Sequence, residues 1–207
     1  MTFNCSDAIS GIASCPAPVL LSAQGTNLSV KGTATDNAGN SNQTTIGGIN
    51  IETTAPAVTY TGNAGTYNVD QTVNITCGVT PSLSPITTST CTKINGAAYS
   101  FGLGAHPYSA SASDQAGNTG TGKTSFNVVL NFTGLIGLVN QFETKAGIAA
   151  EIVADIQGAQ ASFAMGIINA GDNQLNAASN LISAQSGKSL TTMQAALLIQ
   201  YLRALRM

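Results

Sequence analysis

Two hydrophobic patterns divide the chain near residue 131. Before that point, small and β-branched residues alternate with polar ones in short runs separated by Gly, Asn, Ser and Pro. Such alternation predicts antiparallel β-strands. The predicted strands are Thr2–Cys5, Val19–Ala23, Leu28–Asp36, Asn42–Glu52, Ala57–Thr61, Gln71–Cys77, Cys91–Asn95 with Ala98–Phe101, Pro107–Asp114 and Gly122–Asn131.

From Thr133 onward the apolar residues recur at helical spacing instead. Gly147, the Gly171-Asp172 pair and Gly187 interrupt this pattern. Four helices are therefore predicted, near 134–144, 148–169, 172–186 and 190–205. Amphipathic stripes of this kind normally face a core, so a small four-helix bundle is expected.

A repeat organises the β part of the chain. The pentapeptide Asp-x-Ala-Gly-Asn occurs at Asp36–Asn40 and again at Asp114–Asn118, and similar strands flank both copies. A period of about eighty residues indicates two copies of one module. We therefore predict two antiparallel β-sandwich modules, residues 1–54 (module one) and 55–131 (module two), followed by a helical module at 132–207.

Module one has no counterpart of the predicted strand Ala57–Thr61, because only Met1–Asn4 precede its first cysteine. An unpaired sheet edge is a liability in a soluble fold. The missing strand is expected either in sequence upstream of Met1 or in another chain that completes the sheet. We expect the chain to be the C-terminal part of a longer exported protein.

The four cysteines fall as one pair in each module, Cys5 with Cys15 and Cys77 with Cys91. Four cysteines allow three connectivities, and these two pairings are expected because a repeated module should close its own loop. Buried free thiols are the alternative. A zinc site fits less well, because the chain has one histidine and no C-x-x-C spacing. Disulfides indicate an oxidising, extracellular environment.

Composition excludes several classes of protein. Charged residues make up 8 % of the chain and the net charge is −2, so the basic patch of a nucleic-acid-binding protein is absent. No apolar run reaches the roughly 20 residues of a membrane span. The chain lacks Trp, which weakens the case for a sugar-binding platform.

Candidate chemistry is sparse. Asp36, Asn40, Asp114 and Asn118 could supply oxygen ligands to Ca²⁺, although Asp and Asn in such turns also satisfy the hairpin backbone. No other cofactor is expected. Residues Gly117–Thr124 match the phosphate-binding pattern G-x-x-x-x-G-K-T, but a strand pattern follows where that loop requires a helix. His106 has no accompanying nucleophile motif, so no catalytic residue is predicted.

Both β modules resemble the bacterial Ig-like and HYR-type repeats of secreted and surface proteins. The matching segments are FNCSDAISGIASC with GTATDNAGN in module one and VNITC with YSASASDQAGN in module two. The helical module resembles the C-terminal FIMAH module, through LIGLVNQF, NQLNAASNLISAQSGKSLT and QAALLIQYLRAL. These resemblances imply an Ig-like fold and a non-catalytic spacer, adhesion or display role outside the bacterial cell.

The leading expectation is thus a non-enzymatic structural or adhesion module of the bacterial cell surface or secretome. Its partners would be another extracellular protein or a glycan, with no nucleic acid and no membrane span. One alternative is an accessory carbohydrate-binding region of a secreted hydrolase, in which Tyr60, Tyr67, Tyr99 and Tyr108 would carry the sugar contacts. Another is a filament subunit whose open edge in module one is completed by a neighbour's strand.

Overall fold

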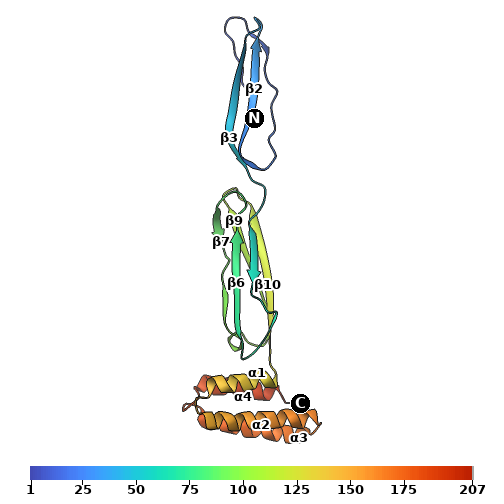
Figure 1. Ribbon diagram of the computed structural model, residues 1–207, viewed down its shortest axis with the longest axis vertical. Helices are drawn as coiled ribbons and strands as arrows, with labels where there is room; N and C mark the ends of the chain where they lie inside the picture. The colour runs from blue at the N-terminus through green and yellow to red at the C-terminus, as the bar shows by residue number, and fades with distance from the viewer. Residues whose placement is uncertain (207) are drawn as a thin grey trace. The chain divides into compact units, whose positions relative to one another are not determined.

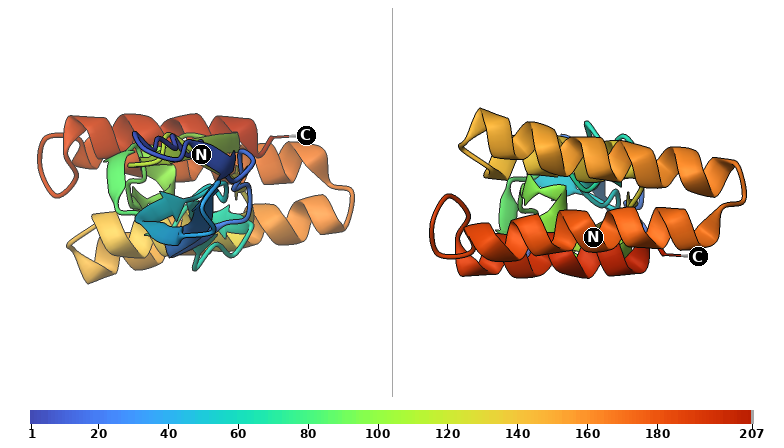
Figure 2. Two further views of the ribbon diagram at one scale, coloured as in Figure 1. Left: turned by 90° about the horizontal axis from the view of Figure 1, so that it is seen from above. Right: turned by 90° about the horizontal axis from the view of Figure 1, so that it is seen from below.

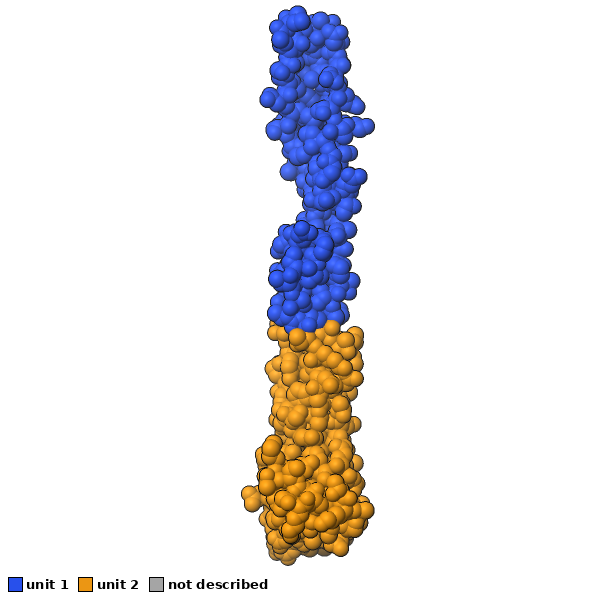
Figure 3. All heavy atoms as spheres, turned by 90° about the vertical axis from the view of Figure 1, so that its left-hand side faces the viewer, with its two compact units in different colours: residues 1–59, 78–91, 110–122 blue, residues 60–77, 92–109, 123–207 orange. Residues whose placement is uncertain are grey.

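The computed structural model describes residues 1–206, and across them ten strands precede four helices (Figure 1). The β-then-α arrangement predicted from the change of period is confirmed. The chain divides into two compact units (Figure 3). Unit 1 comprises residues 1–59, 78–91 and 110–122, and unit 2 comprises residues 60–77, 92–109 and 123 onward. The division passes through module two, whose long strands contribute residues to both units.

Module one contains one antiparallel sheet, in the order β1 (Ile12–Ser14), β2 (Gly25–Asp36), β3 (Ser41–Ile51). The predicted strands that flank the Asp36–Asn40 turn are confirmed as β2 and β3. The pattern did not predict β1, which is too short to show alternation. β3 forms one edge of the sheet.

Two predicted strands of module one are wrong, Thr2–Cys5 and Val19–Ala23. These segments run opposite one another and share two backbone hydrogen bonds: the Met1 amino group donates to the Val19 carbonyl at 2.8 Å, and the Val19 N–H donates to the Met1 carbonyl at 2.9 Å. Pro16 and Pro18 lie just before the second segment and cannot donate to a ladder. Module one therefore has one regular sheet faced by two irregular segments.

Module two is a sandwich of two sheets, β5-β10-β9-β7 and β4-β6-β8. The short segment Ala98–Ser100, predicted to be a strand, is instead a 3-10 helix (η1). β5 pairs parallel with β10, whereas β6 pairs antiparallel with β8 and β7 pairs antiparallel with β9. The strands are β4 (Ala57–Thr61), β5 (Thr66–Asn68), β6 (Thr72–Thr80), β7 (Ile86–Ser89), β8 (Ile94–Ala97), β9 (Gly104–Asp114) and β10 (Thr119–Val129).

The helical module is a four-helix bundle formed by α1 (Phe132–Phe142), α2 (Ala146–Ala164), α3 (Ile168–Gln185) and α4 (Thr192–Ala204). α1 contacts α2 and α4, and α3 contacts the same two helices (Figure 2). α4 begins with a capping box, in which Thr191 and Gln194 satisfy each other's backbone N–H groups. None of the helices in residues 1–206 has the length and apolarity needed to cross a membrane.

The corner between α2 and α3 lies earlier than predicted. α2 ends at Ala164, because Gly166 takes a positive φ of 73° that terminates the helix. Gly171, which the sequence pattern suggests is a break, lies inside α3. A Cβ at this position would collide with the ring of Phe163. Gly171 thus allows close approach of two helices.

The apolar core is distributed unevenly. In unit 2, one continuous cluster of buried residues runs from the β-strands into the bundle, from Tyr67, Val69 and Phe126 to Leu135 and Leu138. Among the residues of module one, by contrast, Val30 is the one buried hydrophobic residue. Module one therefore depends on its disulfide and its hydrogen bonds more than module two does.

Candidate functional site

The two Asp-x-Ala-Gly-Asn turns close their hairpins in the same way. Asp36 accepts backbone N–H groups of Ala38 at 2.9 Å and Asn40 at 2.8 Å, and its second oxygen accepts the Asn40 side-chain amide at 2.8 Å. These hydrogen bonds, led by that side-chain amide, lower the pKa of Asp36. Asp114 accepts the N–H of Asn118 at 2.8 Å and its side-chain amide at 3.1 Å.

Calcium coordination at these turns stays a prediction from the sequence. Asp36 and Asp114 use both carboxylate oxygens for the turn hydrogen bonds. Within residues 1–206, no three His, Cys, Asp or Glu side chains come together as a metal-binding group. In the observed geometry each Asp side chain accepts hydrogen bonds from its own hairpin turn, which is the structural role described for Asp and Asn in such turns.

Cys5 and Cys15 form a disulfide, with their Cα atoms 5.9 Å apart. Cys77 and Cys91 are disulfide-bonded as well, and residues 1–206 contain no free cysteine. These are the cysteines that the repeat assigns to module one and module two respectively. In module one the bond ties the irregular N-terminal segment to the end of β1.

A carboxylate binds two backbone N–H groups at the tip of module two, and it comes from the end of module one. The Glu52 oxygens accept the N–H of Leu83 at 2.6 Å and the N–H of Ser84 at 2.7 Å. These contacts, the Leu83 bond first, lower the pKa of Glu52. The Glu52 carbonyl also accepts the Asn118 side-chain amide at 3.3 Å. We call this arrangement the Glu52 clamp.

Module one has an equivalent pair of N–H groups and supplies its own carboxylate. Asp7 accepts the N–H of Ile9 at 3.0 Å and that of Ser10 at 2.6 Å through one oxygen. Ile12 pairs with Asp36 as Ile86 pairs with Asp114, so Ile9 and Ser10 occupy the positions of Leu83 and Ser84.

The sequence already contains a signal for this difference, which the hydrophobic pattern does not reveal. Asp7 has no acidic counterpart in the Gly78-Val79-Thr80-Pro81 segment of module two. Glu52 is the acidic residue shortly before module two, and it accepts the equivalent pair of backbone N–H groups. Asp114, next to the Glu52 clamp, is buried, whereas Asp36 in module one is half-exposed.

A second set of contacts joins module two to α1. Gly137 lies against the side chain of Asp70, which a Cβ at this position would strike. Gln141 donates its side-chain amide to the Asp70 carbonyl at 2.8 Å, and Asn131, the N-cap of α1, donates to the Asn68 side chain at 2.8 Å. We call this region the Asp70 seam. One Asp70 carboxylate oxygen is buried there without a hydrogen-bond partner among the described residues.

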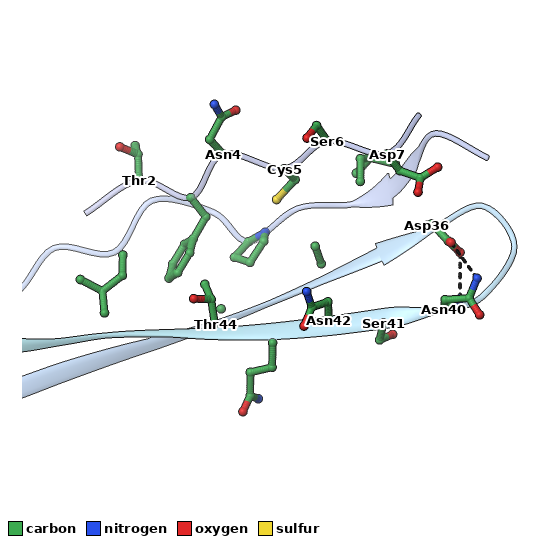
Figure 4. Close-up of a pocket in the computed structure, with 17 residues that line it drawn as sticks. Thr2, Asn4, Cys5, Ser6, Asp7, Asp36, Asn40, Ser41, Asn42 and Thr44 are labelled. Carbon is green, nitrogen blue, oxygen red and sulfur yellow. Dashed lines mark hydrogen bonds between the residues drawn. The ribbon is translucent and has the colours of Figure 1, made fainter. Parts of the chain in front are cut away.

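A cavity in module one lies between the N-terminal segment and the β2–β3 hairpin (Figure 4). Its volume is about 620 Å³. Asn42 and Thr44 line it from β3, and Thr2, Asn4 and Ser6 lie along the opposite wall. Only Asp7 and Asp36 contribute charged side chains to its lining, both at one end.

The histidine, the segment that matches a phosphate-binding loop and the four tyrosines all lie in structural environments. His106 contacts the Gly102 carbonyl at 3.0 Å through Nε2 and packs near the rings of Phe101 and Phe126. The segment that matches a phosphate-binding loop forms the turn and first half of β10, and the strand continues after it to Val129 where that loop would require a helix. The four candidate tyrosines for sugar stacking, Tyr60, Tyr67, Tyr99 and Tyr108, are buried or packed against the core.

The helical module places two acidic groups in distinct settings. Desolvation, followed by repulsion from Glu151 one turn away, raises the pKa of Asp155. Glu143 is buried and accepts the N–H of Lys145 at 3.0 Å and the Ser189 hydroxyl at 2.8 Å. Glu143 thus ties the α1–α2 corner to the segment before α4.

No protein-family model matches the chain, and no curated protein matches it. One similar solved structure contains fibronectin(III)-like modules of Clostridium thermocellum CbhA, with a TM-score of 0.29 and 15% sequence identity. The match covers 48% of this chain and 60% of that chain, so this chain spans less than two thirds of that structure's length. The Ig-like assignment of module two therefore rests on the strands described above.

Proposed function

We propose that this chain is a non-catalytic extracellular structural module, a spacer that presents a neighbouring domain or surface. The observation that carries the proposal is the construction of the two junctions, the Glu52 clamp and the Asp70 seam. In the clamp, the Glu52 side chain of module one accepts backbone N–H groups of module two, and in the seam the Gln141 side chain of the helical module donates to a backbone carbonyl of module two. A freely jointed tether would have no need of such contacts.

Two features support an extracellular location. The cysteines are disulfide-bonded, and disulfides persist mainly in oxidising compartments. The sheets expose Ser, Thr and Asn in place of charged residues; for example, the hydroxyls of Thr35 and Ser41 bond each other across β2 and β3 at 3.0 Å. A bacterial origin and membership of the HYR and FIMAH families belong to this proposal and rest on the sequence segments that resemble them.

The absence of catalysis is likewise part of the proposal. His106 contacts a backbone carbonyl and aromatic rings, which is the environment of a structural histidine. Because the four tyrosines lie in or against the core, they do not form the exposed aromatic platform that sugar binding usually requires. These placements favour a structural role over a carbohydrate-binding one.

A distance measurement across the Glu52 clamp tests the spacer proposal. Spin-label amino acids at Thr45 in β3 and Thr88 in β7, both exposed, should give one narrow distance distribution by pulsed electron paramagnetic resonance. Glu52→Gln should broaden this distribution, because the substitution replaces one carboxylate oxygen by an NH2 group, which cannot accept a backbone N–H. A broad distribution in the unmodified chain would show a flexible tether and contradict the proposal.

A further inference from the structure

The tips of the two modules share one loop arrangement. In module one the loop ends at Gly11, whose carbonyl accepts the Asn37 N–H of the neighbouring turn at 3.1 Å. In module two it ends at Pro85, whose carbonyl accepts the Gln115 N–H of the equivalent turn at 2.9 Å. A strand follows each loop directly, β1 or β7. The two residues before Gly11 or Pro85 carry what we call the tip N–H pair: Ile9 and Ser10 in module one, Leu83 and Ser84 in module two.

In module two the tip N–H pair binds a carboxylate from outside the module. The Leu83 N–H donates to one Glu52 oxygen at 2.6 Å, and the Ser84 N–H donates to the other at 2.7 Å. The Asn118 side chain holds the main-chain carbonyl of the same glutamate at 3.3 Å. Hydrogen bonds to an ionised carboxylate are roughly twice as strong as those between neutral groups. The two N–H groups therefore match the two oxygens of one carboxylate.

In module one the same pair is filled from within the loop. Asp7 lies two residues before Ile9, and one Asp7 oxygen accepts the N–H groups of Ile9 and Ser10. That oxygen also accepts the Gly11 N–H at 2.9 Å and the Ser10 hydroxyl at 3.1 Å. These contacts, led by the Ser10 N–H, lower the pKa of Asp7, so the site favours an ionised carboxylate. A carboxylate from another segment would find these N–H groups occupied.

Two prolines remove this internal arrangement from module two. Pro81 stands at the position of Asp7, two residues before the tip N–H pair, and has no side-chain acceptor. Pro85 stands at the position of Gly11 and has no N–H to donate. The loop of module two therefore has the N–H pair but no carboxylate of its own. Its two donors are left for an acidic residue of another segment, and Glu52 supplies that residue.

We propose that the tip N–H pair is a binding site for a carboxylate of the polypeptide that enters the module, and that an aspartate two residues before the pair closes this site from within. The tip of module two is the receptive form and takes Glu52. The tip of module one is the closed form, because Asp7 fills it. The residue at the position shared by Asp7 and Pro81 thus decides whether an incoming acidic residue holds the module. The proposal concerns how each tip is filled and holds whether or not the chain acts as a spacer.

Rescue by a free carboxylate tests the binding site. In the full chain, Glu52→Ala should accelerate hydrogen exchange at the tip N–H pair of module two, measured by NMR at neutral pH. Sodium acetate should then slow this exchange several-fold and saturably, whereas acetamide or sodium chloride at the same concentration should not. The pair of module one should ignore acetate while Asp7 is present and should respond to it in Asp7→Ala. An equal effect of acetate and acetamide, or no effect of acetate on Glu52→Ala, would overturn the proposal.

Transfer of the aspartate tests the closing residue. Pro81→Asp combined with Glu52→Ala should restore slow exchange at the tip N–H pair of module two without acetate and should abolish the acetate response. Pro81→Ala combined with Glu52→Ala is the matched control, which should stay fast and responsive to acetate. Dispersed spectra establish that each variant is folded, and if Asp7→Ala unfolds module one, the module two variants decide. Equal exchange in the two double variants would show that an aspartate at this position does not close the site.

Discussion

The ring of Tyr99 meets the ring of Phe142 edge to face, with the ring centroids 5.0 Å apart. Tyr99 belongs to the 3-10 helix of module two, and Phe142 is the last residue of α1. The contact lies in the core cluster that runs from the strands of unit 2 into the bundle. Module two and the helical module are therefore joined by apolar packing as well as by the polar contacts of the Asp70 seam.

Removal of the Phe142 ring should destabilise both sides of this junction. Phe142→Ala is expected to cost about 3–5 kcal/mol, the usual range for loss of a buried phenyl ring. Urea unfolding monitored by hydrogen exchange should show α1 and β6 losing protection together. Met193→Ala, at a position that is 82% exposed, is the matched control and should change little. Loss of protection in the helices alone would contradict a shared core.

Two glycines of the bundle should respond to alanine in opposite directions. Gly137→Ala places a methyl group against Asp70 and should cost about 1–3 kcal/mol, as overpacking usually does. Gly147 lies in the first turn of α2, and a methyl group added there would meet no atom within 4 Å. Gly147→Ala should therefore cost nothing and gain up to about 1 kcal/mol of helix propensity. Thermal denaturation of the two variants compares them directly.

The Glu52 clamp should depend on pH. The folded-state pKa of Glu52 is lowered below the ordinary value of 4.5, so its stabilisation is present above that pH and is lost as the pH falls through the lowered pKa. Hydrogen exchange at Leu83 and Ser84 should accelerate in Glu52→Gln at neutral pH. The N–H groups of Ile9 and Ser10, which Asp7 holds, should keep their protection in that variant. Unchanged exchange at Leu83 would show that the clamp contributes nothing.

The disulfide of module one should matter more to its module than the other disulfide does to module two. A closed loop with a sequence separation of 10 stabilises by roughly 2–3 kcal/mol in the chain-entropy model. Since Val30 is the one buried hydrophobic residue among the described residues of module one, Cys5→Ser with Cys15→Ser should expose β2 and β3 to exchange. The equivalent double variant in module two should leave β9 and β10 protected. Retained protection in β2 and β3 would contradict this dependence.

The sequence predicted those elements whose pattern is set locally. Alternation located β2, β3, β4, β9 and β10, and the Asp and Asn side chains of the repeated turns explain where the hairpins reverse. Helical spacing located the four helices; the last was predicted from residue 190 and begins at Thr192, after the capping box of Thr191 and Gln194. These features depend on residues close together in the chain.

The missed features depend on residues far apart. Gly171 resembles a helix break in the sequence, yet it is required by the ring of Phe163 on the neighbouring helix. Thr2–Cys5 alternates like a strand but forms no regular ladder, because the described backbone bonds to the facing segment are those between Met1 and Val19. The roles of Glu52 and Asp70 follow from contacts between modules, which a pattern within one module cannot reveal.

The central claim is that specific hydrogen bonds and packing contacts hold neighbouring modules together. It is tested most directly by ¹⁵N relaxation across the Asp70 seam. The account predicts one rotational correlation time for β5, β6 and the four helices, with no additional nanosecond motion at Leu130 and Asn131. A shorter correlation time for the helices than for these strands, or rapid motion at Asn131, would show independent tumbling and contradict it.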